Sequence, residues 1–141
     1  MKKTICLMLV LMLLCVSTLP VFAEERAVSV ELKGEMLTFP DTQPQLVNGR
    51  TMVPMRFIFE KLGASIWWDD ANQTVFAFTE QDTMVMQIGS DRMFINDEPL
   101  ALDVPPQLIG ERTMVPLRAV SESFGLKVEW NDETSTVIIT E

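Results

Sequence analysis

The chain has 141 residues, with 11 basic and 20 acidic side chains, a formal net charge of −9, no histidine and no tyrosine. This length corresponds to one ordinary domain or two very small ones. The excess of acid argues against a nucleic-acid-binding protein, which needs a basic surface against phosphates, and against docking by charge onto anionic lipid. Both cysteines, Cys6 and Cys15, lie in the first 23 residues. The rest of the chain therefore lacks the usual zinc and copper ligands and most nucleophile–base pairs.

The first 23 residues are typical of a secretory signal peptide, with Lys2 and Lys3 before an apolar run and small residues before the expected cleavage after Ala23. A retained transmembrane anchor is the competing interpretation, but the uninterrupted run is shorter than the roughly 20 residues that span a bilayer. A lipoprotein would use Cys15, which follows a bulky leucine where such signals have a small residue. We expect a secreted protein, free or associated with the cell wall, that starts near Glu24 and has no membrane span after processing.

The rest of the chain contains an internal repeat. Residues 44–79 align with residues 106–141 at an offset of 62 without a gap, and 15 of 36 positions are identical. A match of this kind is typical of a duplicated unit. We expect one domain, residues 24–141, made of two tandem repeats at about 28–80 and 82–141. The repeated positions of greatest structural interest are Arg50 and Arg112, Pro54 and Pro116, Arg56 and Arg118, Gly63 and Gly125, and Trp68 and Trp130.

Each repeat begins with two hairpins. Leu32-Lys33-Gly34 and Phe94-Ile95-Asn96 indicate a strand that runs into a turn. In the next hairpin, Asn48-Gly49 is typical of a type I′ turn, in which both central residues have positive φ. The second repeat has Gly110-Glu111 there, which fits the related type II′ turn with glycine first. We expect the same hairpin register in both repeats with different turn chemistry.

A short helix follows. Pro54 and Pro116 mark the helix starts, because proline is tolerated at the first helical position and forces the preceding residue to be extended. Gly63 and Gly125 end the helices. Each helix has about nine residues, too few to be stable alone, so it must pack on a sheet. The apolar stripes that would face the sheet are Met55, Ile58, Phe59 and Leu62, and Leu117, Val120 and Phe124.

A third hairpin closes each repeat, with strands at 65–68 and 74–79, and again at 127–130 and 136–140. The turn Asp69-Asp70-Ala71-Asn72 offers oxygen ligands of the kind calcium prefers, but it lacks the glycine and the distal glutamate of a calcium loop. A solvated turn is the favoured interpretation. The fold class is α+β: antiparallel β-sheets, each packed on a short α-helix, internally duplicated.

Strand alternation divides the tryptophans between two faces. Trp68 and Trp130 point inward, whereas Trp67 points outward together with Phe76 and Phe78. These three outward aromatics have two interpretations. They form a platform that binds sugar rings or a partner protein, or they are buried against the other repeat, since each unit is too small to be stable alone.

Two stretches share the pattern Gly-Arg-Thr-x-Val-Pro-x-Arg, a helix, and Gly-x-x-x-x-Trp-Asp: they read NGRTMVPMRFIFEKLGASIWWDD and GERTMVPLRAVSESFGLKVEWND. They resemble the stalk-type repeat of the copper amine oxidase N-terminal domain family over essentially all of residues 28–141. Gly110-Glu111 in place of Asn-Gly, and Asn131 in place of Asp, are the departures. The resemblance implies an accessory stalk outside any catalytic domain, of a kind that occurs in secreted and wall-associated proteins.

Copper amine oxidases hold copper through histidines and build their quinone cofactor from a tyrosine, and this chain has neither residue. Copper amine oxidation by this chain is therefore excluded, and we expect no catalytic residue, no metal and no cofactor. Four arginines recur in the repeats: Arg50, Arg56, Arg112 and Arg118. In one interpretation they form an anion clamp. In the favoured structural one, each helix arginine pairs with the glutamate four residues later, Glu60 or Glu122, or donates hydrogen bonds to loop carbonyls near the proline turn.

The sequence as a whole indicates a secreted, non-catalytic stalk or interaction module that binds cell-wall polymer or another surface protein and does not bind nucleic acid. The alternative from another class is a secreted hydrolase that uses paired acidic residues, which requires a cleft and two carboxyl groups with opposed pKa values. Whether the two repeats share one core is a question for the structure.

Overall fold

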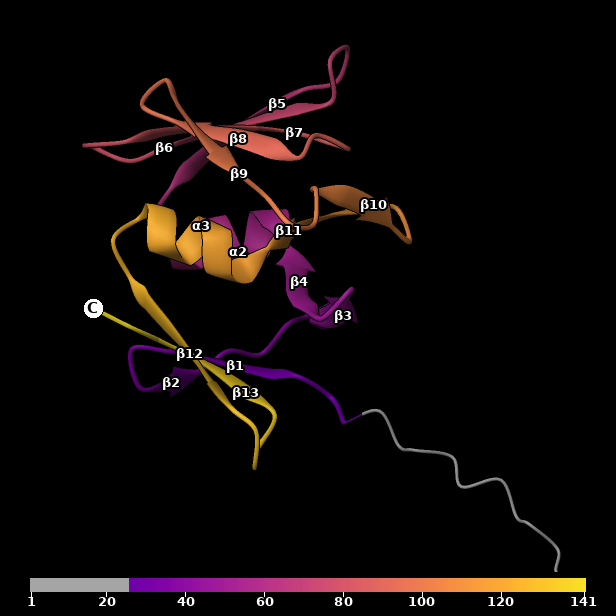
Figure 1. Ribbon diagram of the computed structural model, residues 1–141, viewed down its shortest axis with the longest axis vertical. Coiled ribbons are helices and arrows are strands. Elements are labelled where there is room, and N and C mark those ends of the chain that lie inside the picture. Colours follow the sequence, from indigo (N-terminus) through magenta and orange to yellow (C-terminus); the bar gives the residue numbers. More distant parts are fainter. Residues whose placement is uncertain (1–25) are drawn as a thin grey trace, which may run out of the picture.

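The computed structural model describes residues 26–141. The expected signal peptide at 1–23 lies outside the described residues. Within them, no helix is long and apolar enough to cross a membrane. The described chain forms three tiers, in which a middle tier of two helices and a four-stranded sheet lies between two outer sheets (Figure 1). The mixture of mainly antiparallel sheets and two short helices agrees with the α+β class.

The middle sheet joins the two halves of the chain, which are residues 28–80 and 82–141. Its order is β10-β11-β4-β3, with β3 at Gln45–Val47, β4 at Arg50–Pro54, β10 at Gln107–Ile109 and β11 at Arg112–Pro116. At its centre β4 and β11 run antiparallel, and Val53 lies opposite Val115, the residue 62 positions later. The β3–β4 and β10–β11 hairpins therefore pair through equivalent edge strands, β4 and β11, as two subunits of a symmetric dimer would.

Both of these hairpins have type I′ turns. Asn48 and Gly49 have φ values of 49° and 77°, and Gly110 and Glu111 have values of 55° and 67°. The expected type II′ turn at Gly110-Glu111 is wrong, because that turn needs a positive φ only at its first central residue. The twist of a type I′ turn matches the twist of the strands it joins, and this match outweighs the cost of a left-handed glutamate at position 111.

The two helices, α2 (Met55–Lys61) and α3 (Leu117–Ser123), start directly after the strand-ending prolines. Pro54 and Pro116 precede the first helical residue instead of occupying that position as expected, because their ψ angles of 122° and 114° are extended. Gly63 and Gly125 follow the helix ends with φ of 79°, as expected. The apolar stripes are confirmed: most of their side chains are buried, while Leu62 and Phe124 are partly buried against the same core.

Each outer sheet contains strands from both halves of the chain. The five-stranded sheet, in sequence order, consists of β5 (Ser65–Asp69), β6 (Thr74–Phe78), β7 (Thr83–Gln87), β8 (Arg92–Ile95) and β9 (Glu98–Ala101). The four-stranded outer sheet has the order β12-β13-β1-β2, with β12 at Lys127–Asn131, β13 at Thr136–Thr140, β1 at Ser29–Leu32 and β2 at Glu35–Met36.

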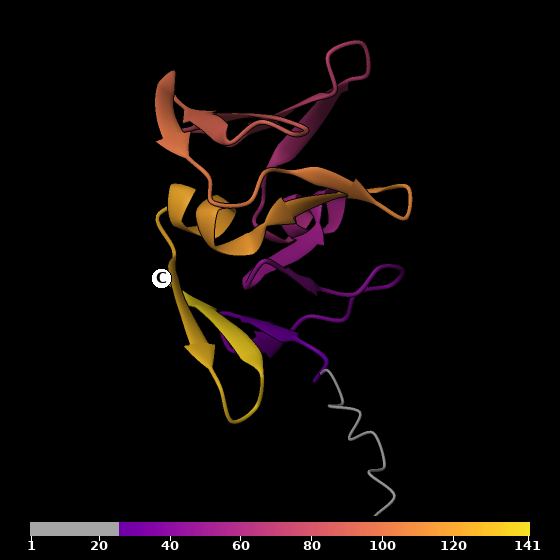
Figure 2. The same ribbon diagram turned by 45° about the vertical axis from the view of Figure 1, so that its right-hand side comes forward.

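The expectation that each repeat forms its own antiparallel sheet is therefore wrong. The first strand, β1, lies beside the last, β13 (Figure 2), and the two run parallel, with Val30 opposite Val137. The strand β7 follows β6 through a short turn and so must pair antiparallel with it. No hairpin links β1 to β13, so either direction of pairing is open to them.

The main hydrophobic core extends through both halves, beside a smaller cluster of Met52, Val104 and Met114. A single cluster of buried side chains includes Val53 and Phe59 from the first half and Val115, Leu117 and Ile139 from the second. The helix α3 packs on β4 as well as on its own β12, and α2 packs on β11 as well as on its own β5. Neither half therefore encloses a core of its own, which answers the question left by the sequence.

Candidate binding surfaces

The five-stranded sheet carries a row of apolar side chains on the face turned away from the helices. Strand register places Trp67, Phe76, Val85, Phe94 and Pro99 opposite one another in turn. On β5 to β8 the residues between them point to the other face, where they join the core with the helices. We call these five residues the aromatic row. It crosses four strand spacings of about 4.8 Å, so its length is about 19 Å.

The aromatic row is open to solvent. Trp67 is 57% exposed and Phe94 is 41% exposed, and no element of residues 26–141 lies over this face (Figure 1). The rings of Trp67 and Phe76 lie 5.0 Å apart between centroids and are tilted by 41°. Phe78, two residues along β6, is 40% exposed. Burial of Trp67 and Phe78 against the second half of the chain is therefore wrong, because β7 to β9 extend this sheet sideways instead of covering it. Phe76 is half-buried.

Polar side chains border the aromatic row along the strands. On one side of it lie Asp69, Thr74 and Gln87, which are opposite one another in turn on β5, β6 and β7. On the other side lie Ser65 and Thr83, with Phe78 between them. Sequence reasoning missed Val85, Phe94 and Pro99 as members of the row. Alternation along β7 and β8 was visible in the sequence, but only the strand register aligns these residues with Trp67.

The turn after β5 is held by Asp69. One oxygen of its carboxylate accepts the backbone N–H groups of Ala71 and Asn72 at 3.1 and 3.3 Å, and the other accepts the Asn72 side-chain N–H at 2.8 Å. The side-chain bond from Asn72 and these backbone bonds lower the pKa of Asp69. Within residues 26–141, no group of three or more His, Cys, Asp or Glu side chains is placed to hold a metal ion. Both carboxylate oxygens of Asp69 are thus occupied by hydrogen bonds within the turn.

The four arginines do not meet at one place. Arg50 pairs with Asp103 and Arg112 with Asp41, each across the two halves of the chain, while Arg118 pairs with Glu122 at 3.5 Å. These pairs support the structural interpretation and not the anion clamp. No ion pair joins Arg56 to Glu60 in the described part of the chain, so that expected pair is wrong. Holding two long exposed side chains together gains little free energy, so the absence of this pair costs the fold little.

The aspartates of the two cross pairs were missed by sequence reasoning. Asp41 and Asp103 are 62 residues apart, as are Arg50 and Arg112, so each pair repeats the other with the halves exchanged. The repeated aspartate lies three residues before the start of the gapless alignment, which begins at Pro44 in the first half. A longer alignment would have found it, but only the fold shows that the partners come from opposite halves.

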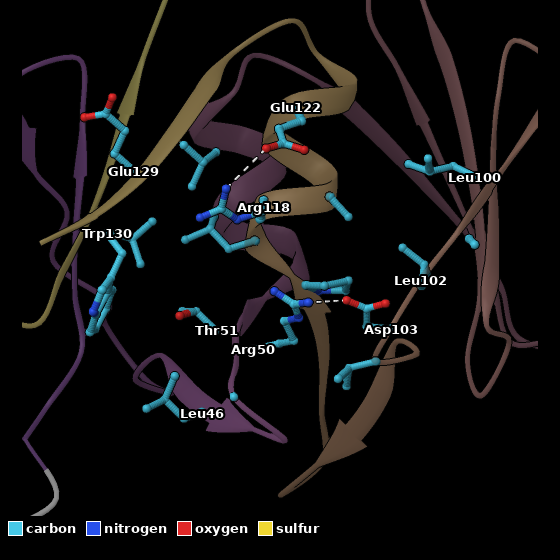
Figure 3. Close-up of a pocket in the computed structure, with 18 residues that line it drawn as sticks. Leu46, Arg50, Thr51, Leu100, Leu102, Asp103, Arg118, Glu122, Glu129 and Trp130 are labelled. Carbon is cyan, nitrogen blue, oxygen red and sulfur yellow. Dashed lines mark hydrogen bonds and ion pairs between the residues drawn. The ribbon is translucent and has the colours of Figure 1, made fainter. Parts of the chain in front are cut away.

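Two cavities lie beside these pairs. The larger, of about 500 Å³, lies open to one side between α3, β12, the β3–β4 hairpin and the segment after β9 (Figure 3). Trp130 lines it and is 42% exposed. Its expected burial is wrong, because its side of β12 faces a cavity. The smaller cavity, of about 350 Å³, is lined by Trp68, which is half-buried. Each indole N–H donates to the aspartate two residues later, Asp132 or Asp70.

A search among curated proteins finds no match to this chain. The profile of the copper amine oxidase N-terminal domain matches residues 31–139, which include both halves of the middle sheet, both helices and both outer sheets. An N-terminal domain of this type suggests a non-catalytic accessory domain. Because the match spans well over half of the chain, the protein belongs to the copper amine oxidase N-terminal domain family.

Proposed function

We propose that the chain is a secreted, non-catalytic interaction module, built from two duplicated stalk units, that binds the neutral glycan strands of a cell-wall polymer through its aromatic row. The observation that carries the proposal is the exposure of Trp67 and Phe94 within a continuous apolar row across five strands.

The chemistry of a sugar chain fits this surface. An aromatic ring has an electron-rich face that attracts the C–H groups of a sugar ring. The polar side chains beside the row, such as Thr83 and Gln87, offer hydrogen-bond partners to hydroxyl groups. Residues 24–141 carry 9 basic and 20 acidic side chains, a balance that repels an anionic polymer and favours a neutral one.

The shape of the row favours a glycan over a protein partner. A stable protein–protein interface buries about 800 Å² on each side. The aromatic row is one side chain wide on β5 and β7, where polar residues border it, and two wide on β6, where Phe78 lies beside Phe76. A narrow stripe of this kind matches an extended chain molecule, whose rings follow one another along a line.

The duplication and the absence of catalysis are parts of the same proposal. Five elements of the first half (β3, β4, α2, β5 and β6) have the bounds of β10, β11, α3, β12 and β13 shifted by 62 residues. Family membership supports an accessory role.

The proposal is tested by sedimentation of residues 24–141 with cell-wall sacculi freed of anionic polymers. Trp67→Ala should lose most of the bound fraction and keep the melting temperature, because surface substitutions change stability by less than about 0.5 kcal/mol. Leu108→Ala is the matched control, since Leu108 is an exposed apolar residue outside the aromatic row. Equal binding by the wild type and Trp67→Ala would contradict the proposal.

A further inference from the structure

The two cavities are built from equivalent positions in the two halves of the chain. Each of the twelve residues around the smaller cavity has a counterpart 62 positions away around the larger one. Each cavity is lined by a hairpin arginine from one half and a helix arginine from the other: Arg112 with Arg56, and Arg50 with Arg118. The differences between the two cavities therefore come from particular substitutions.

One pair of substitutions changes the space available in the two cavities. At the smaller cavity, the rings of Phe39 and Phe57 pack together with centroids 4.6 Å apart, and Lys61 lies 5.6 Å over the Phe57 ring. The counterparts at the larger cavity are Ala101 and Ala119, and both line it. The aromatic pair fills space that the alanine pair leaves open, in keeping with volumes of about 350 and 500 Å³.

The larger cavity has an apolar floor and polar walls. Leu102, Leu117 and Val137 are buried side chains of the floor. The indole of Trp130 stands on one side, and the Arg118–Glu122 pair stands on the helix above it (Figure 3).

The Arg50–Asp103 pair completes the wall on the opposite side from Trp130 (Figure 3). A guanidinium group has five N–H donors, and Arg50 donates one hydrogen bond to a side chain, that of Asp103. Each of the two ion pairs therefore presents both donors and acceptors towards the cavity.

We propose that the larger cavity binds one neutral sugar ring, with Trp130 against its C–H face and the two ion pairs bonded to its hydroxyl groups. A hydroxyl group both donates and accepts, so it is satisfied by an arginine and a carboxylate side by side.

The charges of the lining argue against the other ligand classes. Three carboxylates (Asp103, Glu122 and Glu129) line the cavity with two arginines, which opposes an anion. A wholly apolar ligand would remove the ion pairs from water without new partners, at a cost in free energy. The volume lies within the 300–1,000 Å³ range usual for small-molecule sites.

The site shares no residue with the aromatic row, so either proposal can fail without the other. The test is a ¹⁵N NMR titration of residues 24–141 with glucose, N-acetylglucosamine and their β-1,4-linked trimers. At least one of these four sugars should shift the Trp130 indole N–H signal, with a Kd of about 1 mM or tighter. Trp67→Ala should titrate like the wild type.

The equivalence of the cavities supplies the blocking variant. Ala101→Phe with Ala119→Phe recreates the aromatic pair that the fold already accommodates at Phe39 and Phe57, and it should weaken sugar binding at least tenfold. Arg118→Gln, at an exposed position, should weaken binding as well and provides a second variant if the double one folds poorly. Absence of any shift with all four sugars, or unchanged binding by both variants, would overturn the proposal.

Discussion

Truncation of Phe59 is the most direct test of the single shared core. Its side chain is fully buried in α2, and its ring packs edge-on against Phe124 of the other half, with centroids 6.0 Å apart. Phenylalanine-to-alanine changes in cores cost about 3–5 kcal/mol. Because Phe59→Ala also removes a contact between the halves, we expect a loss of about 4 kcal/mol. At roughly 4 °C per kcal/mol for a domain of this size, the melting temperature should fall by about 15 °C.

The tryptophans allow the two outer sheets to be followed separately. Fluorescence of a Trp130→Phe background reports Trp67 and Trp68 in the five-stranded sheet, and a background with both of those replaced reports Trp130 in the other outer sheet. With one core, Phe59→Ala should lower both urea midpoints equally, and circular dichroism should give the same midpoint. Phe78→Ala, at an exposed position, should change them little. Two separated transitions, or a loss confined to the sheet of β5–β9, would refute the shared core.

Four further outcomes are expected. Ser121→Ala should leave stability unchanged or raise it by up to about 1 kcal/mol in chemical denaturation, because the buried Ser121 hydroxyl has no hydrogen-bond partner among the described residues; a marked loss would show a partner. Asn72→Ala should raise the pKa of Asp69 towards its ordinary value of 3.8 in a ¹³C NMR titration. The folded pKa is the lower one, so the stabilisation from these bonds is complete above the ordinary value and is lost as the pH falls through the folded value; an unchanged titration would contradict this. Elemental analysis of dialysed protein should find no stoichiometric copper or zinc, since residues 24–141 lack histidine and cysteine; one tightly held ion per chain would overturn this. Mass spectrometry of the exported protein should find an N-terminus near Glu24, and a lipid on Cys15 would contradict the signal-peptide interpretation.

Local rules account for the part of the fold that the sequence predicted. The helix stripes follow from a period of 3.6 residues, and the helix ends follow from glycine's freedom to adopt positive φ at Gly63 and Gly125. The Asn48-Gly49 turn is equally local. Each of these signals lies within a few residues of the structure that it determines, and the outward parity of Trp67 and Phe78 belongs to the same class.

The remaining features depend on contacts between distant residues. Nothing near Val30 indicates that it will lie beside Val137, because a parallel pairing without a hairpin has no turn signal. Trp130 lines the same cavity as Ala119, where the other half has Phe57. The sequence showed the inward parity of Trp130 correctly, but parity does not tell whether the space it faces is filled.

The parallel pairing of β1 with β13 also has a mechanical consequence. A pull on the segment before β1 and on the segment after β13 draws the two strands in opposite directions along their lengths, because they run the same way. The load then falls at once on the hydrogen bonds between them, from Ser29 N to Ser135 O at 3.0 Å to Lys33 N to Ile139 O at 2.8 Å. Strands sheared in this manner must break their bonds together, whereas a hairpin peeled from its end opens one bond at a time. The parallel pairing of β1 with β13 thus resists tension applied through the two ends of the domain.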